Sequence, residues 1–84
     1  MTLLFTPAAR EDLDYWEQRD QRMANRIRQL LRKLEQGLEL PAHQQTQLKF
    51  GSLFLMSVKL SAEHRLVLEP LGEQIIVHQC RFHY

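Results

Sequence analysis

Near its C-terminal end, the sequence carries three residue types that together suit phosphate chemistry. Arg65 opens an apolar run, and His83 and Tyr84 end the chain. An arginine can hold a phosphate through its fork of donors, and a histidine can move a proton near neutral pH. A tyrosine can stack on a base or donate a hydrogen bond. Brought together, these side chains would form a site suited to cutting RNA.

A ribonuclease that uses no metal needs a base for the ribose 2′-hydroxyl, a cation for the phosphate and an acid for the leaving 5′-oxygen. Arg65 and Lys59 are the candidate cations, and His83 is the candidate acid. The structural alternative for Arg65 is a salt bridge with Glu63 or Glu69. For His83, the alternative is a frayed chain end.

The sequence offers no recognisable metal or cofactor site. Its four histidines have no compact ligand spacing, and one cysteine cannot build a structural zinc site. The three glycines are not grouped into a phosphate-binding loop. We therefore expect neither a metal nor a cofactor.

Two helices are expected after residues 3–5, a short apolar run that predicts an edge strand. Thr6 is a good N-cap with Pro7 at the first helical position. Asp20 is a good N-cap for the second helix, and Gly37 would end it. Apolar residues at helical spacing define the two core faces: Ala9, Leu13 and Trp16 in the first helix, and Met23, Ile27, Leu30, Leu31 and Leu34 in the second.

The second half of the chain reads as strands. Residues 38–46 are expected to be a loop, and strand patterning resumes near Leu48. Further strands are predicted at residues 64–69 and 74–80, with a turn at Pro70-Leu71-Gly72. Alternation places Lys59 and Arg65 on, or close to, the face opposite Val58. In residues 53–60, Phe54, Met56, Val58 and Leu60 share one face, and Leu53, Leu55, Ser57 and Lys59 share the other.

The predicted order of elements is β-α-α-β-β-β. This order indicates an α+β fold in a single domain over residues 1–84, with two N-terminal helices packed on a small, twisted, mainly antiparallel sheet. The 84 residues suffice for one modest core.

Charge gives weak support for nucleic-acid binding. The formal net charge is only +1, whereas proteins that bind the phosphate backbone usually carry a clear basic excess. Basic residues gather in residues 19–33, where Arg22 and Arg26 are candidates to contact RNA or an acidic partner. The alternative is that these arginines only form a solvated helix surface.

The sequence predicts a cytoplasmic protein. Cys80 is the only cysteine, so no internal disulfide can form, which fits a reducing compartment. The first residues have neither the basic segment nor the apolar stretch of a signal peptide. No run approaches the ~18 apolar residues of a membrane span.

Two motifs give the chain a family resemblance. Residues 62–67 read Ala-Glu-His-Arg-Leu-Val, and residues 80–84 read Cys-Arg-Phe-His-Tyr. Together with Asp14-Tyr15-Trp16 and Leu48-Lys49, they resemble the YoeB branch of the RelE-like toxins, the ribosome-dependent mRNA endonucleases of bacterial toxin–antitoxin pairs. The resemblance covers essentially the whole chain.

The resemblance implies a compact microbial-RNase-like fold and cleavage of mRNA in the ribosomal A site by attack of the 2′-hydroxyl. It implies an antitoxin whose C-terminal segment covers the active site, and pairing of two toxin copies. Carried over residue by residue, Arg65 would hold the phosphate, His83 would be the general acid and Tyr84 would orient the substrate. Lys49 falls on a matching basic position.

One departure from the family pattern concerns the general base. The family has a glutamate just ahead of the Leu-Lys pair, and here that position is Thr46. A threonine hydroxyl cannot accept a proton at neutral pH as a carboxylate does. Lys59 replaces a family arginine and keeps the charge without the fork. Met56 replaces an aromatic residue.

Two accounts of these departures remain open. In the first, the protein is a nuclease in which His83, His43 or Glu39 takes over the base role. In the second, the site is weakened, and the chain acts by binding an antitoxin or the ribosome. A third alternative is a gyrase-directed toxin of the same fold. The His83-Tyr84 ending argues against it, because a toxin that acts on gyrase needs no acid–base group.

Overall fold

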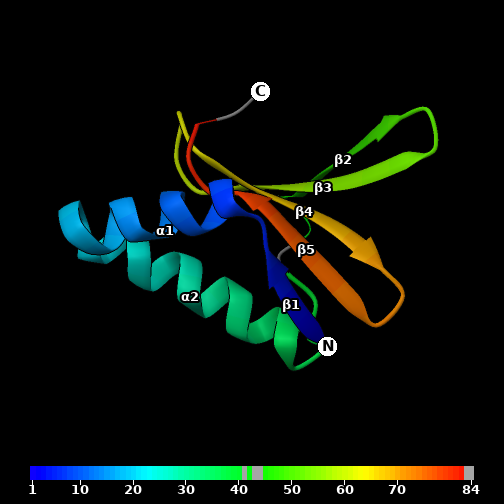
Figure 1. Cartoon of the computed structure of the whole chain (residues 1–84), viewed down its shortest axis with the longest axis horizontal. Helices are drawn as coiled ribbons and strands as arrows, with labels where there is room; N and C mark the ends of the chain where they lie inside the picture. The colour runs from blue at the N-terminus through cyan, green and yellow to red at the C-terminus, as the bar shows by residue number, and fades with distance from the viewer. Residues whose placement is uncertain (41, 43–44, 83–84) are drawn as a thin grey trace.

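The computed structural model describes residues 1–40, 42 and 45–82. Its elements are β1 (Thr2–Phe5), α1 (Pro7–Arg19), α2 (Gln21–Glu35), β2 (Gln45–Phe50), β3 (Leu53–Lys59), β4 (Arg65–Leu71) and β5 (Gln74–Gln79). The strands form one sheet in the order β1-β5-β4-β3-β2. β1 pairs with β5 in parallel, and the other neighbours are antiparallel. Both helices lie on one side of this sheet (Figure 1), so the predicted α+β fold is confirmed.

Local signals position the helices as the sequence predicts. The Thr6 hydroxyl accepts a hydrogen bond from the Ala9 N–H at 3.1 Å, and Pro7 opens α1. The Asp20 carboxylate accepts from the Met23 N–H at 3.1 Å and caps α2. Each cap satisfies a backbone donor that the first helical turn would leave unpaired. Gly37, with φ of +74°, follows α2 in the left-handed region that glycine adopts readily.

The hydrophobic core lies between the helices and the sheet. Both helical stripes are buried as predicted, apart from Met23, which packs at the margin of the core. The sheet adds alternate residues from β3, β4 and β5, because side chains alternate between faces along a strand. The buried contributions from these strands and the segments next to them are Val58, Leu60, Leu66, Leu68, Ile75, Val77 and Cys80.

The region predicted as one strand from Leu48 to residue 60 is in fact a hairpin. β2 and β3 pair from Gln45 opposite Val58 to Phe50 opposite Leu53. Gly51 has φ of +60° and turns the chain between them. One isolated glycine was too weak a turn signal, so the sheet has one strand more than predicted. The predicted loop over residues 38–46 was also too long, because β2 already includes Thr46.

The turn predicted at residues 70–72 lies slightly later in the chain. β4 continues through Pro70, which pairs with Ile75, and the loop contains Gly72 at φ of +61°. Pairing of β4 with β3 ends at Leu68. A proline beyond that point removes no hydrogen bond from the ladder, so the strand tolerates it.

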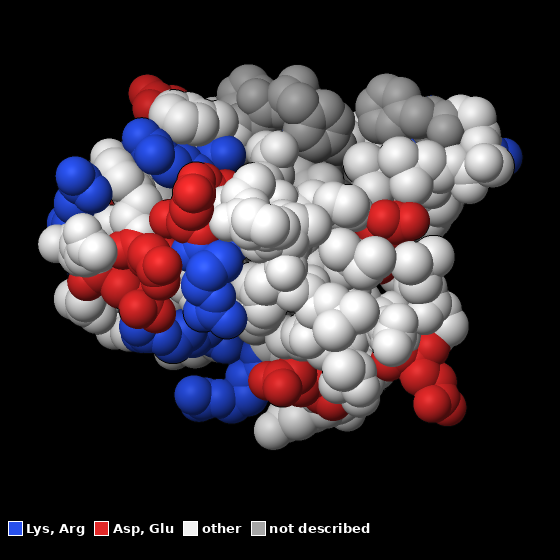
Figure 2. All heavy atoms as spheres, viewed as in Figure 1, with Lys and Arg blue, Asp and Glu red and all other residues white. Residues whose placement is uncertain are grey.

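Charged side chains gather over the helical half of the molecule. Figure 2 shows basic and acidic groups interspersed there, while much of the neighbouring sheet surface in this view is uncharged. In the described part of the chain, neither helix is long and apolar enough to cross a membrane.

Candidate functional site

Arg65, at the start of β4, is held against β3 by hydrogen bonds. Its Nε donates to the Ser57 hydroxyl, and its Nη2 donates to the Ser57 carbonyl at 3.1 Å and to the Thr46 hydroxyl at 3.4 Å. Ser57 is only 2% exposed. Among the described residues, Nη1 has no partner. The guanidinium is therefore fixed from one side and can offer donors to a ligand from the other.

These groups lie on the sheet face turned away from the helices. Thr46 pairs with Ser57 across β2 and β3, and Lys59 pairs with Arg65 across β3 and β4. Val58, between Ser57 and Lys59, is completely buried in the core under the helices. Alternation then places all four polar side chains on the opposite, open face. The sequence prediction for Lys59 and Arg65 agrees with this arrangement.

The last described residue, Phe82, is attached directly beside Arg65. The Phe82 N–H donates to His64 Nδ1 at 2.8 Å, and the Arg65 N–H donates to the Phe82 carbonyl at 3.0 Å. Phe82 is thereby fixed in a left-handed conformation, with φ of +63°. His83 and Tyr84 follow immediately and lie outside the described residues, as does His43.

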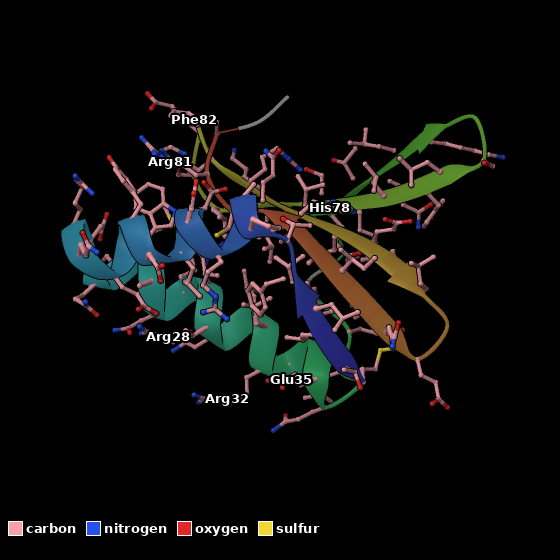
Figure 3. All side chains as sticks on the ribbon, viewed as in Figure 1. Arg28, Arg32, Glu35, His78, Arg81 and Phe82 are labelled. Atoms are coloured by element: carbon pink, nitrogen blue, oxygen red, sulfur yellow. The ribbon has the colours of Figure 1, made fainter. Side chains whose placement is uncertain are left out.

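Helix α1 holds residues 80–81, which directly precede Phe82. Trp16 Nε1 donates to the Cys80 carbonyl at 2.8 Å, and the Cys80 N–H donates to Asp12 Oδ2 at 3.1 Å. The Arg81 guanidinium lies 3.6 Å from the Tyr15 ring centre, a cation–π contact. Asp12, Tyr15 and Trp16 project from one helix face at spacings of three and four. Figure 3 shows Arg81 and Phe82 where the chain passes above α1.

Burial shifts the acid–base properties of two groups in this attachment. It raises the pKa of the Asp12 carboxyl, although the Cys80 N–H and the Arg81 charge act in the opposite direction. Burial, together with the nearby Asp12 charge, raises the pKa of the Cys80 thiol to about 12. The thiol is therefore a buried packing group that stays protonated.

The other candidate RNA contacts are distributed around the molecule. Lys49 pairs with Phe54, so alternation places it on the face opposite Arg65, near the tip of the β2–β3 hairpin. Arg22 and Arg26 line a hollow on the flank of α2. Arg26 Nη2 donates to the Lys59 carbonyl at 3.2 Å and so connects that flank to the end of β3.

The alternatives for Arg65 and for the base can now be compared with the structure. Among the described residues, Arg65 forms no salt bridge with Glu63 or Glu69, so that structural alternative is wrong. Glu69 instead pairs with His78, at 2.8 Å. Glu39 lines a pocket on the helix side of the sheet, together with the core residue Leu34 and with Met56, which packs against the core. This pocket is away from the Arg65 face.

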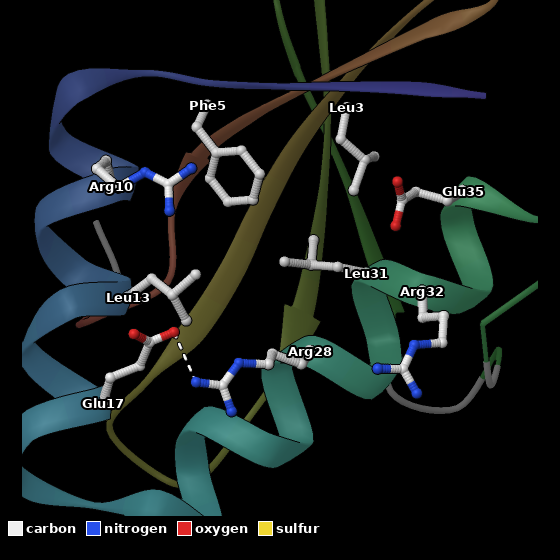
Figure 4. A pocket seen from close by; sticks show the side chains of 9 residues that line it. All are labelled: Leu3, Phe5, Arg10, Leu13, Glu17, Arg28, Leu31, Arg32 and Glu35. Atoms are coloured by element: carbon white, nitrogen blue, oxygen red, sulfur yellow. Dashed lines mark ion pairs between the residues drawn. The ribbon is translucent and has the colours of Figure 1, made fainter.

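A second hollow lies between β1 and the helices. It has a volume of about 490 Å³, with a floor that includes Leu3, Phe5 and Leu31. Figure 4 shows arginine and glutamate side chains around this floor, including the ion pair between Arg28 and Glu17 at 2.6 Å. The hollow is on the helix side of the sheet and contributes nothing to the Arg65 site.

Sequence reasoning missed the residues that support the site. Ser57 was recognised only by its position in an alternating strand, yet it holds Arg65 through both its hydroxyl and its carbonyl. The available signal was a serine that shares its strand face with Leu53 and Leu55. His64 and Asp12 were not singled out, because their partners, Phe82 and Cys80, are far away in sequence. In the part of the chain that the structure describes, no three His, Cys, Asp or Glu residues are grouped as metal ligands.

The fold and site define a small α+β protein whose open sheet face presents a fixed arginine beside its C-terminal segment. Residues 5–84 match the family model described as YoeB-like toxin of bacterial type II toxin-antitoxin system. The chain belongs to this family.

Individual relatives agree with this assignment over all or nearly all of their length. Toxin YoeB from Streptomyces coelicolor is 27% identical, with complete coverage of both chains. The structure of a YoeB/ParE toxin from Agrobacterium tumefaciens is 31% identical, with a TM-score of 0.83 and complete coverage of both chains. A YoeB–YefM complex from Staphylococcus aureus contains a chain that is 28% identical, with a TM-score of 0.80, covering 100% of this chain and 98% of that one.

Proposed function

We propose that this protein is the toxin of a type II toxin–antitoxin pair and a ribosome-dependent mRNA endonuclease that cleaves in the ribosomal A site and so inhibits translation. The observation that carries the proposal is the backbone bond from Arg65 to Phe82 at 3.0 Å. It joins the only fixed arginine of the described open sheet face to the residue immediately before His83. The proposed phosphate-binding arginine is thereby bonded to the residue that directly precedes the candidate acid in the sequence.

In the proposed reaction, Arg65 holds the scissile phosphate and stabilises its developing charge. The ribose 2′-oxygen gives up its proton to a base and forms a bond to phosphorus. The bond from phosphorus to the 5′-oxygen breaks, and His83 donates a proton to that oxygen. Tyr84 orients the substrate. The products are a 2′,3′-cyclic phosphate and a 5′-hydroxyl, and the reaction requires no metal or cofactor.

The remaining basic groups are proposed to guide RNA to this site. Lys59 pairs with Arg65 across two strands, so its charge lies near the bound phosphate. Arg22 and Arg26 extend positive charge from the end of β3 along α2. Lys49, at the hairpin tip, would contact ribosomal or messenger RNA farther from the cut. Such contacts supply affinity without reading sequence.

The proposed partners are a cognate antitoxin, the ribosome with its mRNA, and a second copy of the chain. A Staphylococcus aureus relative forms a complex with YefM, and a YoeB dimer from the same species is also known. These relatives support an antitoxin and a homodimer here. Because ribosomes and mRNA are the proposed targets, we assign the protein to the cytoplasm.

The second candidate function is a weakened toxin that binds its antitoxin or the ribosome without cutting. The favouring observation is that Thr46, at the position of the family's glutamate, contributes only a hydroxyl that contacts Arg65 at 3.4 Å. A hydroxyl cannot take up a proton as a carboxylate does. This candidate predicts binding without cleavage products.

The test incubates purified protein with translating ribosomes and a defined mRNA. Wild type is compared with His83→Ala, Thr46→Glu and the surface control Lys33→Ala. The endonuclease proposal expects discrete A-site cuts by wild type and Lys33→Ala that disappear in His83→Ala. If Thr46→Glu cuts and wild type does not, the protein is a toxin that has lost its general base. Ribosome or antitoxin binding without cuts by any variant would favour the binding function.

A further inference from the structure

Glu69 and His78 form a second polar pair on the sheet. His78 Nε2 lies 2.8 Å from Glu69 Oε1, and their side chains are 35% and 15% exposed. A carboxylate can only accept, so Nε2 carries the proton and donates it to Glu69. Among the described residues, Nδ1 of His78 has no hydrogen-bond partner. The pair therefore fixes the ring and leaves one nitrogen available to accept a proton.

This pair lies on the same sheet face as Arg65. Leu68 and Val77 face each other across β4 and β5 and are both completely buried under the helices. Glu69 follows Leu68, so alternation places its side chain on the open face, and the bond to Glu69 places the His78 ring there as well. Figure 3 shows His78 on the end of β5 that lies near the C-terminal segment.

An irregularity in the strand pairing falls at His78. Val67 pairs with Gln79, while the next residue, Leu68, pairs with Val77, so His78 is an extra residue in β5. Such a bulge re-aims the side chain that it carries. The bulge lies opposite Val67, which itself pairs with Ser57.

The register places the imidazole and the guanidinium on either side of Val67. The Arg65 side chain rests on Ser57 in β3, and His78 lies in β5, with β4 between them. Two strand spacings correspond to about 10 Å. Val67 itself is buried, at 2% exposure, so a nucleotide with its phosphate on Arg65 would pass across this buried position toward His78. The ribose 2′-hydroxyl is the acidic group of that nucleotide that needs a base.

From this arrangement, we infer that His78, held by Glu69, is the general base that replaces the family's glutamate. The inference rests on the proposed endonuclease function. In the step, the 2′-hydroxyl proton moves to His78 Nδ1 as the 2′-oxygen bonds to phosphorus, and the Glu69 carboxylate stabilises the imidazolium that forms. His83 then protonates the departing 5′-oxygen, so the proton balance of the cleavage is complete.

The test measures single-turnover cleavage on mRNA-programmed ribosomes by wild type, His78→Gln and Glu69→Gln. Glutamine places an amide near the position of His Nε2, so it keeps a donor for Glu69 but removes the base. We expect His78→Gln to lower the maximal rate roughly 100-fold or more with little change in apparent KM. Glu69→Gln should have a smaller effect. Glu17→Gln, which breaks the ion pair with Arg28 on the helix side, is the matched control and should leave the rate unchanged.

A rescue separates a catalytic role from a structural one. Thr46→Glu is added to His78→Gln, and urea unfolding checks that each variant folds. Recovery of most of the lost rate supports the base assignment, because a carboxylate beside Arg65 then supplies the missing function. If wild type cuts and His78→Gln remains fully active, the assignment of the base is wrong, while the proposed nuclease stands. The assignment is also wrong if His78→Gln folds but is inactive, and adding Thr46→Glu does not restore cutting. A silent wild type would overturn the proposed nuclease and its base together.

Discussion

His64 and Phe82 are connected twice, although 18 residues separate them. The Phe82 N–H donates to His64 Nδ1 at 2.8 Å, and the two rings lie 5.5 Å apart at a tilt of 46°. His64 also packs edge-on against Trp16 at 4.7 Å. One ring thus joins helix α1, the start of β4 and Phe82. The candidate acid, His83, follows Phe82 directly in the sequence.

Replacing His64 should therefore impair catalysis more than stability. His64→Ala removes the acceptor for the Phe82 N–H and is expected to cost about 1 kcal/mol of unfolding free energy. Cleavage should fall roughly 100-fold, because misplacement of a catalytic group by about 1 Å has effects of that size. Urea unfolding and ribosome-dependent cleavage measure the two quantities.

The control for this prediction is His64→Asn, whose amide oxygen can occupy the place of Nδ1. It should recover a substantial part of the cleavage lost in His64→Ala. Equal loss in both variants would argue that ring packing, and not the hydrogen bond, positions the end of the chain.

Trp16→Phe tests the buried bond between α1 and the C-terminal segment. Phenylalanine keeps most of the ring packing but leaves the Cys80 carbonyl, which accepts from Trp16 Nε1 at 2.8 Å, without that donor. Burying an unpaired polar group costs about 1–3 kcal/mol, so the urea midpoint should fall with little change in slope. An unchanged midpoint would indicate that water reaches the carbonyl.

Asp12→Asn tests the raised pKa of the Asp12 carboxyl. A group whose pKa is raised by folding favours the fold while protonated, and this contribution disappears as the pH rises from about 4 through the raised pKa. Asparagine can still accept from the Cys80 N–H and carries no charge. We expect the variant to be as stable as wild type or more stable at pH 7, and their difference to shrink toward pH 3.

The matched variant for this experiment is Asp14→Asn, which changes an exposed carboxylate on the same helix. It should leave the pH profile of stability near that of wild type. If Asp12→Asn lost stability at pH 7, the attraction between Asp12 and Arg81 would outweigh the cost of burial.

Arg65→Lys tests the need for a fork of donors. A lysine keeps the positive charge, but it cannot reproduce the bonds to Ser57 and Thr46 and still bind a phosphate through two donors. We expect roughly 100-fold slower cleavage. Arg32→Lys, on exposed α2 surface, is the control, and comparable cleavage by Arg65→Lys would show that charge alone suffices.

Cys80 should resist alkylation in the folded protein. Its thiol is completely buried, and its pKa of about 12 keeps it protonated at pH 8. Because the thiolate is the reactive form, iodoacetamide should label the native protein far more slowly than the protein in urea. Equal rates in both conditions would show that the segment around Cys80 opens readily.

Local sequence signals determined the helical half of the protein. Thr6 and Asp20 cap their helices through contacts three residues along the chain, and periodic apolar residues identify the buried faces. Such features depend on near neighbours, so pattern reasoning captures them. Arg65 and Lys59 were likewise placed on one face by alternation alone.

The tertiary structure decided the details of the sheet and the surroundings of Arg65. The β2–β3 hairpin depends on pairing between strands, and the bulge at His78 has no local sequence signature. The contacts of Ser57 with Arg65, His64 with Phe82 and Asp12 with Cys80 join positions 8 to 68 residues apart. The sequence by itself named the residue types that suit phosphate chemistry. Only the folded chain decided which of them share a face, because strand register and helix docking are set by packing over the whole domain.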